Sequence, residues 1–320
     1  MNRAPFPWFG GKSRAAPLIW RALGDVDSYV EPFLGSAAAL LGRPGGAPEG
    51  SKVETVNDAD GFLSNFWRAI AHDPEGVARH ADWPVNETDL SARHLWLVGQ
   101  RAALTERLQV DPDHYDAKIA GWWVWGACAW IGSGWCSGEG PWTSDGERWI
   151  NGNAGMGINR QLPHLGDAGR GIEAWFVALA ERLRRVRVCC GDWHRVVASE
   201  ATMFGPARGP AGVVGVLLDP PYPDGFDAEE GCYSAGGGAD VWHDAAAWAV
   251  EAGADRRVRI VLCGYSGTWT APGDWREVPW VARKGYQSDT VNSNRERLWL
   301  SPGCLDVGGR GQQTSLFGAA

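Results

Sequence analysis

Val216–Tyr222 reads Val-Leu-Leu-Asp-Pro-Pro-Tyr, which is three apolar residues followed by an acid, two prolines and an aromatic residue. The apolar run predicts the end of a buried strand. Asp219 then stands at the carboxyl end of that strand, where open α/β sheets bind their ligands. Pro220 and Pro221 fix their own φ angles and cannot extend a sheet, so the turn is rigid. The Asp219 carboxylate and the Pro220 carbonyl can each accept an N–H, and the Tyr222 ring can stack on a planar group. The stretch therefore predicts a site for a flat molecule that carries an amino group.

The composition is that of a globular protein. Of the 320 residues, 44% are hydrophobic and 21% are charged, which excludes an intrinsically disordered chain. The formal net charge of −8 argues against a protein that coats nucleic acid without regard to sequence. We expect no membrane segment and no signal peptide, because no apolar run is long enough and residues 1–12 contain no apolar core. The seven cysteines form no regular framework, so a reduced, cytoplasmic setting is expected.

Three earlier stretches also predict ligand contacts. Trp8–Ser13 contains Gly-Gly-Lys, where two glycines allow close approach of the backbone and a lysine adds a cation. Ser28–Ser36 predicts a strand and a tight turn, followed by a helix from Ala37, which is the βα unit that cradles nucleotide-like ligands. Glu54–Asp58 predicts a second strand that ends in an acid placed to accept ribose hydroxyls. An alternative role for Asp58 is to cap the helix that follows.

These stretches, together with Asp219–Tyr222, resemble the DNA adenine N6-methyltransferase family. The order of Gly-Gly-Lys, ligand turn, inserted region and Asp-Pro-Pro-Tyr is similar to that of the Dam-like alpha group, in particular its phage and prophage members. Cys190–Trp193 resembles the segment that flanks the cofactor's adenine, and Asn294–Leu300 resembles the closing strands of phage-type members. The resemblance covers roughly residues 1–80 and 171–303.

The resemblance implies an α/β fold, a Rossmann-like S-adenosylmethionine-dependent methyltransferase sheet that is mostly parallel with an antiparallel last strand. It implies that the catalytic residues are Asp219, Pro220, Pro221 and Tyr222. It also implies that S-adenosylmethionine is bound by Trp8, Gly10, Gly11, Lys12, Glu31, Pro32, Phe33, Gly35, Ser36, Asp58, Asp192, Trp193 and Asp219. One departure is Ala37, which stands where the family often has a second glycine, and its methyl group is expected to crowd the methionine moiety slightly.

Residues 81–170 differ in character from the remainder and predict an inserted target-recognition region. Leu90–Leu108 has helical periodicity, and the chain from residue 121 to 157 is rich in glycine and tryptophan. We expect residues 1–80 and 171–305 to form the catalytic domain and residues 306–320 to form a disordered tail. Double-stranded DNA is the expected partner. Side chains of the types that read base edges or contact phosphates are Arg148, Asn151, Asn153, Asn159, Arg160 and Lys284. The alternative for the insert is a capping subdomain packed by tryptophans.

The expected reaction is direct, in-line methyl transfer to the N6 amino group of adenine after the base is flipped out of the duplex. No metal is expected, because Cys128 and Cys136 lack the spacing of paired zinc ligands. Three alternatives stay open: N4-cytosine methylation, methylation of RNA or of a protein amide, and a non-catalytic DNA-binding relic. Serine is more usual than Asp219 in the cytosine enzymes, and asparagine in the glutamine methylases. We expect a monomer or weak dimer, and a restriction endonuclease partner is compatible with the sequence but not indicated by it.

Overall fold

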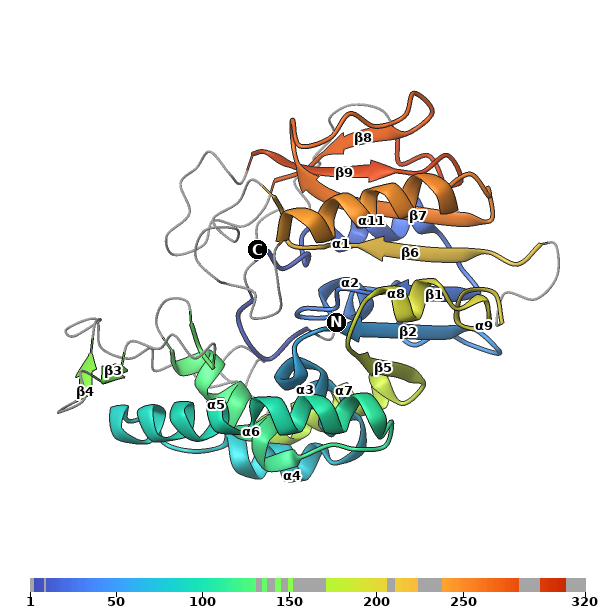
Figure 1. The fold of residues 1–320 in the computed structure, drawn as a ribbon. Helices are drawn as coiled ribbons and strands as arrows, with labels where there is room; N and C mark the ends of the chain where they lie inside the picture. The colour runs from blue at the N-terminus through green and yellow to red at the C-terminus, as the bar shows by residue number, and fades with distance from the viewer. Residues whose placement is uncertain are drawn as a thin grey trace, which may run out of the picture.

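A seven-stranded sheet forms the centre of the computed structural model (Figure 1). The structure describes residues 3–8, 10–130, 134–136, 142–144, 149–151, 171–205, 211–223, 238–281 and 294–308. The strands of the sheet are β1 (Ser28–Glu31), β2 (Val53–Asp58), β5 (Val186–Cys190), β6 (Val214–Leu218), β7 (Val258–Tyr265), β8 (Arg276–Pro279) and β9 (Glu296–Leu300). Their order across the sheet is β5-β2-β1-β6-β7-β9-β8.

The strands from β5 to β7 are parallel, and β9 runs antiparallel to both of its neighbours. This confirms the expectation of a mostly parallel α/β sheet with an antiparallel last strand. All residues of β1 and β6 are buried, and β6, Val-Gly-Val-Leu-Leu, is the continuous apolar segment expected of a strand covered on both faces. The strand order reverses between β1 and β6, so a crevice forms beyond their carboxyl ends.

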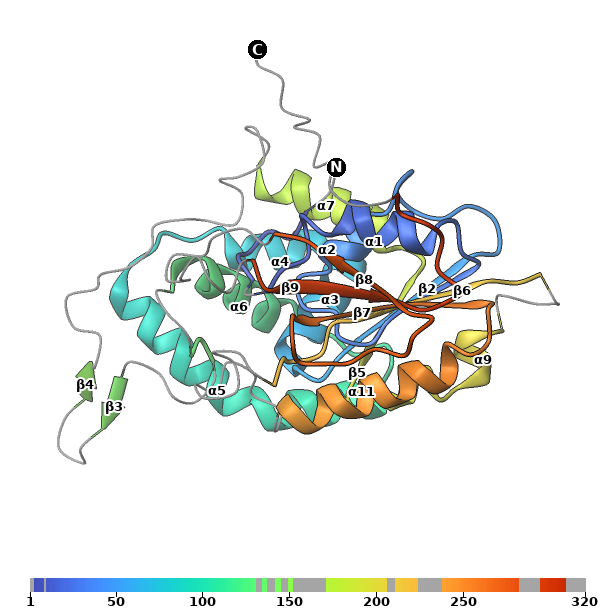
Figure 2. The ribbon, with the colours of Figure 1, turned by 90° about the horizontal axis from the view of Figure 1, so that it is seen from above.

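Helices cover both faces of the sheet. Seen from above, α1 (Ala16–Leu23) lies on one side and α11 (Gly238–Ala252) on the other, and both contact β7 (Figure 2). The remaining helices are α2 (Ala38–Leu41), α3 (Gly61–His72), α4 (Pro74–Ala81), α5 (Glu87–Val110), α6 (Ala117–Ala129), α7 (Ile172–Leu183), α8 (His194–Val197) and α9 (Glu200–Met203). Among the described residues, no helix combines the length and the apolar character needed to cross a membrane.

Two helices within residues 81–170, α5 and α6, pack on the helices next to the sheet. α6 contacts α3 and α4, and Ile119, Trp123 and Val124 belong to the same hydrophobic core as the helices beneath the sheet. The helical pattern predicted for Leu90–Leu108 is confirmed by α5. The sequence analysis missed α6, although Asp116 caps it by accepting from the Ile119 N–H at 2.8 Å. A short hairpin, β3 (Trp142–Ser144) and β4 (Trp149–Asn151), follows.

A closed network of charges lies between β2 and the neighbouring helices. Glu54, 1% exposed, accepts from Arg43 at 3.1 Å and from two guanidinium nitrogens of Arg182 at 2.6 and 2.9 Å. Arg182 also donates to the Leu40 carbonyl at 2.7 Å, and Arg43 donates to the Val26 carbonyl at 3.3 Å. Each oxygen of the carboxylate is therefore engaged by an arginine inside the fold.

Candidate functional site

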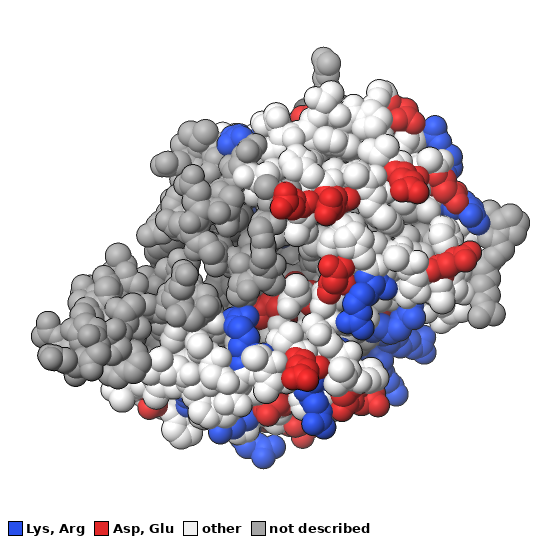
Figure 3. All heavy atoms as spheres, viewed as in Figure 1, with Lys and Arg blue, Asp and Glu red and all other residues white. Residues whose placement is uncertain are grey.

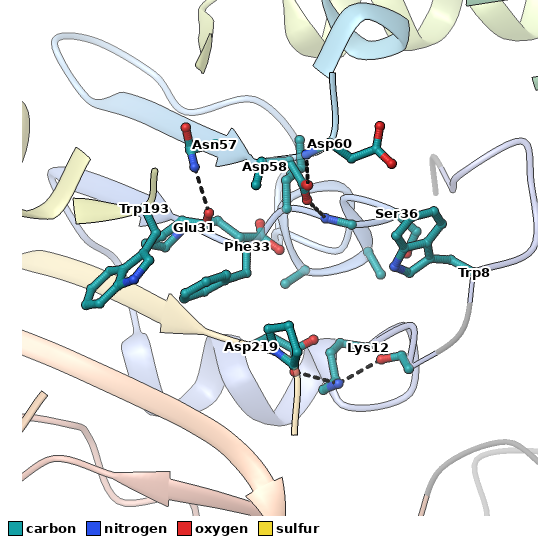
Figure 4. A pocket seen from close by; sticks show the side chains of 18 of the residues that line it. Trp8, Lys12, Glu31, Phe33, Ser36, Asn57, Asp58, Asp60, Trp193 and Asp219 are labelled. Atoms are coloured by element: carbon teal, nitrogen blue, oxygen red, sulfur yellow. Dashed lines mark hydrogen bonds and ion pairs between the residues drawn. The ribbon is translucent and has the colours of Figure 1, made fainter. Parts of the chain in front are cut away.

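A pocket opens where the chain leaves the carboxyl ends of β1, β2, β5 and β6 (Figure 4). Its cavity volume is about 160 Å³, against roughly 10–15 Å³ needed for one water molecule, so a ligand of many atoms can enter. The lining includes every residue predicted to bind the cofactor, namely Trp8, Gly10, Gly11, Lys12, Glu31, Pro32, Phe33, Gly35, Ser36, Asp58, Asp192, Trp193 and Asp219. Segments far apart in the chain thus meet around one cavity.

Lys12 carries a buried cation into the pocket. Its side chain is 5% exposed, and Nζ donates to Asp219 Oδ1 at 2.7 Å and to the Gly10 carbonyl at 2.7 Å (Figure 4). Burial alone would lower the pKa of Lys12. The charges of Asp219 and Glu296 outweigh that effect and raise the pKa above its ordinary value. Lys12 therefore stays an ammonium throughout the physiological pH range.

The turn after β1 is built around Gly35. Its φ is +49°, and a Cβ at this position would lie 2.6 Å from Trp8 Nε1, so only glycine fits without a shift. The Gly35 N–H donates to Asp58 Oδ2 at 3.0 Å, which ties this turn to the end of β2. Trp8 thereby packs directly on the backbone of the turn. Ala37, also in the left-handed region at φ 53°, is fully buried and does not line the pocket.

Two buried carboxyl groups face the pocket with raised pKa values. Burial raises the pKa of Glu31 to about 8, and the nearby charge of Asp219 adds to the effect. The Tyr29 hydroxyl, which donates to Glu31 Oε2 at 2.8 Å, opposes it. Burial raises the pKa of Asp58 to about 6, offset by backbone N–H donors from Asp60 and Gly35. Both groups release their protons more readily when a cation is placed beside them.

The helix cap considered for Asp58 belongs to another residue. Asp60 is the N-cap of α3, and its Oδ1 accepts from the Phe62 N–H at 2.8 Å. Asp58 instead bridges backbone N–H groups of two segments with its two oxygens. The alternative role of Asp58 as a helix cap is therefore wrong, because the cap lies two residues later, at Asp60.

An aromatic wall forms one side of the pocket. The rings of Phe33 and Trp193 lie 5.7 Å apart between centroids at 36°, and Trp193 stacks on His194 at 3.8 Å (Figure 4). Trp193 is 5% exposed, whereas the neighbouring Asp192 side chain is 64% exposed. A wall of this kind suits a planar heterocycle.

The predicted catalytic tetrapeptide is divided by the fold. Asp219 and Pro221 line the pocket, whereas Pro220 and Tyr222 are buried and do not line it. The Tyr222 hydroxyl lies 3.2 Å from Asp219 Oδ1 and 3.2 Å from Glu296 Oε2. Asp219 therefore meets the pocket with its carboxylate held by Lys12 on one side and approached by Tyr222 on the other.

The residues predicted to contact DNA lie almost entirely outside the described residues. This holds for Arg148, Asn153, Asn159, Arg160 and Lys284, and Asn151 is described only as the backbone at the end of β4. Figure 3 shows Lys and Arg gathered on one side of the described surface, around α8 and α9, with acidic residues among them. The DNA-contact predictions stay predictions.

Several lining residues were missed by the sequence analysis. They are Ala38, Ala39, Ala59, Asp60 and Val241, while Leu34, Asn57 and Gly191 lie within predicted ligand stretches but were not themselves assigned to the ligand. Asn57 donates to the carbonyls of Pro32 and Gly191 at 3.0 and 2.9 Å and so joins β1, β2 and β5. Its position next to Asp58 at the end of a strand was a usable signal. Val241 comes from α11, and no local pattern marks it.

Comparison of the sequence with protein-family models and with curated proteins finds no match to either. The chemistry of this pocket is therefore argued from its own residues.

Proposed function

We propose that the protein transfers a methyl group from S-adenosylmethionine to an exocyclic amino group, with N6 of adenine in double-stranded DNA as the target. The supporting observation is the convergence of Gly10–Lys12, Glu31–Ser36, Asp58, Asp192–Trp193 and Asp219 around one cavity. The resemblance assigned these residues to one ligand from separate stretches of sequence, before any contact between them was known. The mostly parallel sheet has the form that the resemblance implies.

The charges of the lining favour a cationic ligand. The pocket is lined by four acids, which are Glu31, Asp58, Asp60 and Asp219. Lys12 is the one lysine or arginine of the described lining, and it is already paired with Asp219. Glu31, with its pKa near 8, would ionise when a cation binds beside it. An anionic pyrophosphate would meet carboxylates here, whereas a sulfonium or ammonium group would be stabilised by them. This supports S-adenosylmethionine over a dinucleotide, in agreement with the single glycine in the turn from Glu31 to Ser36.

The lining also matches the parts of the cofactor. Phe33 and Trp193 would form an aromatic surface against the adenine ring, and Asp58 would accept from ribose hydroxyls with the lone pairs that its two backbone partners leave. Gly10 and Gly11 would allow the amino-acid end to approach the backbone near Lys12. When bound, S-adenosylmethionine supplies an electrophilic methyl group on a sulfonium.

Asp219 is the residue that would act on the amine. The lone pair of an exocyclic amino nitrogen is delocalised into the ring, so the nitrogen is a weak nucleophile. Acceptance of an N–H group by the Asp219 carboxylate, which lines the pocket, would fix its position and favour a lone pair directed out of the ring plane. Lys12 holds Asp219 in place from behind. The contribution of the protein is positioning and electrostatics.

The test is methyl transfer from labelled S-adenosylmethionine to DNA, followed by digestion to nucleosides. We expect N6-methyladenine from the wild-type protein, loss of transfer in Asp219→Ala, and retained cofactor binding in a calorimetric titration of that variant. Asp25→Ala is the matched control, because Asp25 is a surface carboxylate with 75% side-chain exposure. N4-methylcytosine as the product would replace the adenine assignment. Failure of the wild-type protein to bind the cofactor would refute the proposal.

A further inference from the structure

The ring of Tyr222 is held by protein groups on several sides. It is 6% exposed, meets the Tyr265 ring edge-to-face at 4.7 Å and 84°, and lies 5.3 Å from Lys12 Nζ. The resemblance assigned this residue a stacking role through its ring face. In the structure the part of Tyr222 that reaches the reacting carboxylate is its hydroxyl.

The hydroxyl lies between two carboxylates. Asp219 Oδ1 and Glu296 Oε2 are each 3.2 Å from it, and Glu296 is 5% exposed at the start of β9. A tyrosine hydroxyl has one proton, so it makes a full hydrogen bond to only one of the two acceptors at a time. Rotation about one C–O bond moves the proton between them. Tyr222 can therefore donate either to Asp219 or to Glu296.

The acceptor to which Tyr222 donates decides whether Asp219 Oδ1 can accept a further hydrogen bond. Asp219 Oδ1 already accepts from Lys12 at 2.7 Å, and a carboxylate oxygen has two lone pairs. When Tyr222 also donates to it, this oxygen is saturated. When Tyr222 donates to Glu296 instead, Oδ1 regains a lone pair for an incoming N–H. The same oxygen is thus closed or open to an amine according to where the hydroxyl points.

We propose that Glu296 is a positioning residue, which takes the hydrogen bond of the Tyr222 hydroxyl when a target amine binds to Asp219. The inference rests on the proposed function and adds a residue from β9 to the site. Glu296 touches no substrate in this scheme and acts only through Tyr222. Its chemistry requires an acceptor oxygen at the end of the side chain, so glutamine can replace it in part and leucine cannot.

The closing experiment compares single-turnover methyl transfer in the wild-type protein and in Glu296→Leu, Glu296→Gln, Tyr222→Phe and the double variant Glu296→Leu/Tyr222→Phe. We expect Glu296→Leu to slow transfer about tenfold, the rate equivalent of one hydrogen bond, without a change in cofactor affinity. Glu296→Gln should recover part of that loss. The double variant should be faster than Glu296→Leu, because loss of the hydroxyl reopens Asp219. If Glu296 only supported the fold, the double variant would transfer the methyl group more slowly than Glu296→Leu.

Two control variants remove the same kinds of group elsewhere in the structure. Glu277→Leu removes a half-exposed carboxylate on β8, and Tyr115→Phe removes a hydroxyl beside His72, so both should transfer at the wild-type rate. If Glu296→Leu fails to fold, Glu296→Ala removes the acceptor with less bulk. A wild-type rate in the folded Leu or Ala variant, or a double variant slower than the single one, overturns the inference and leaves the proposed function standing. A wild-type protein that transfers no methyl group overturns both.

Discussion

Two clusters of buried charges lie on the same sheet, and they differ in what surrounds them. At Glu54, Arg43 and Arg182 donate to both carboxylate oxygens, and neither Glu54 nor its arginines line the pocket. At Asp219, one lysine donates to a carboxylate whose side chain is 20% exposed and which faces a cavity of about 160 Å³. In the first cluster both carboxylate oxygens are paired inside the fold, which fixes the position of β2 against its helices. The second keeps acceptor capacity at the mouth of a pocket, where a ligand can reach it.

The largest loss of stability should come from removing the charge of Glu54 from its cluster with Arg43 and Arg182. Glu54→Gln removes the carboxylate that pairs with the buried Arg182 and leaves Arg43 only the exposed Asp25 at 3.6 Å, so we expect the free energy of unfolding to fall by about 3–5 kcal/mol. Urea denaturation followed by circular dichroism measures this. Glu277→Gln, which breaks a half-exposed pair with Arg297, is the control and should cost less than about 1 kcal/mol. Equal losses in the two variants would contradict the view that the Glu54 cluster is a structural centre.

Loss of the Lys12–Asp219 ion pair should lower the free energy of unfolding less than loss of the Glu54 charge, but it should reduce methyl transfer more. Lys12→Met removes the ammonium but leaves Asp219 beside a cavity that water can enter, so we expect a loss of about 1–2 kcal/mol, below that of Glu54→Gln. Methyl transfer should be lost, since the carboxylate is no longer fixed. Denaturation and the labelled-methyl assay on one preparation give both numbers. A stability loss as large as that of Glu54→Gln would show that the Lys12–Asp219 pair supports the fold as strongly as the Glu54 cluster does.

The pH dependence of the free energy of unfolding tests the protonation of Glu31, which also lines the cavity. Its pKa is raised from 4.5 to about 8, so between these values the folded protein holds a proton that the unfolded chain releases. Stability from this group is therefore greatest below pH 4.5 and falls as pH rises toward 8, by about 1 kcal/mol per pH unit. Glu31→Gln should remove that dependence, so its free energy of unfolding should gain on the wild type between pH 5 and 8. Parallel urea curves at all pH values would contradict a buried, protonated Glu31.

The smallest effect concerns the turn that holds Glu31 and Gly35 in place. Ala37 sits at φ 53°, where an alanine costs roughly 1 kcal/mol, while its buried methyl group contributes a similar amount. Ala37→Gly should therefore change the free energy of unfolding by less than about 0.5 kcal/mol. Ala22→Gly, at an equally buried position in α1, should cost about 1–2 kcal/mol, because glycine is also a poor helix former. Thermal denaturation of both variants makes the comparison.

Local patterns predicted most of the sheet and much of the pocket. The strand before Asp219 was found from its apolar run, because continuous apolar runs mark strands that are buried on both faces. The pocket residues on the turn after β1 were found because glycine and an acid at strand ends have few other local uses. α6 was missed, since its tryptophans and glycines obscure the helical period.

The sequence by itself determined that Asp219 follows a buried strand, that Gly10 and Gly11 allow close approach of the backbone beside Lys12, and that Ser28–Ser36 form a strand and a tight turn. Each of these follows from neighbours in the chain, whose spacing and backbone preferences are local. Only the tertiary structure decided that Lys12 pairs with Asp219 and that the Tyr222 hydroxyl lies between Asp219 and Glu296. Such contacts join residues from distant strands, and their geometry depends on strand order and side-chain packing, which no local pattern encodes.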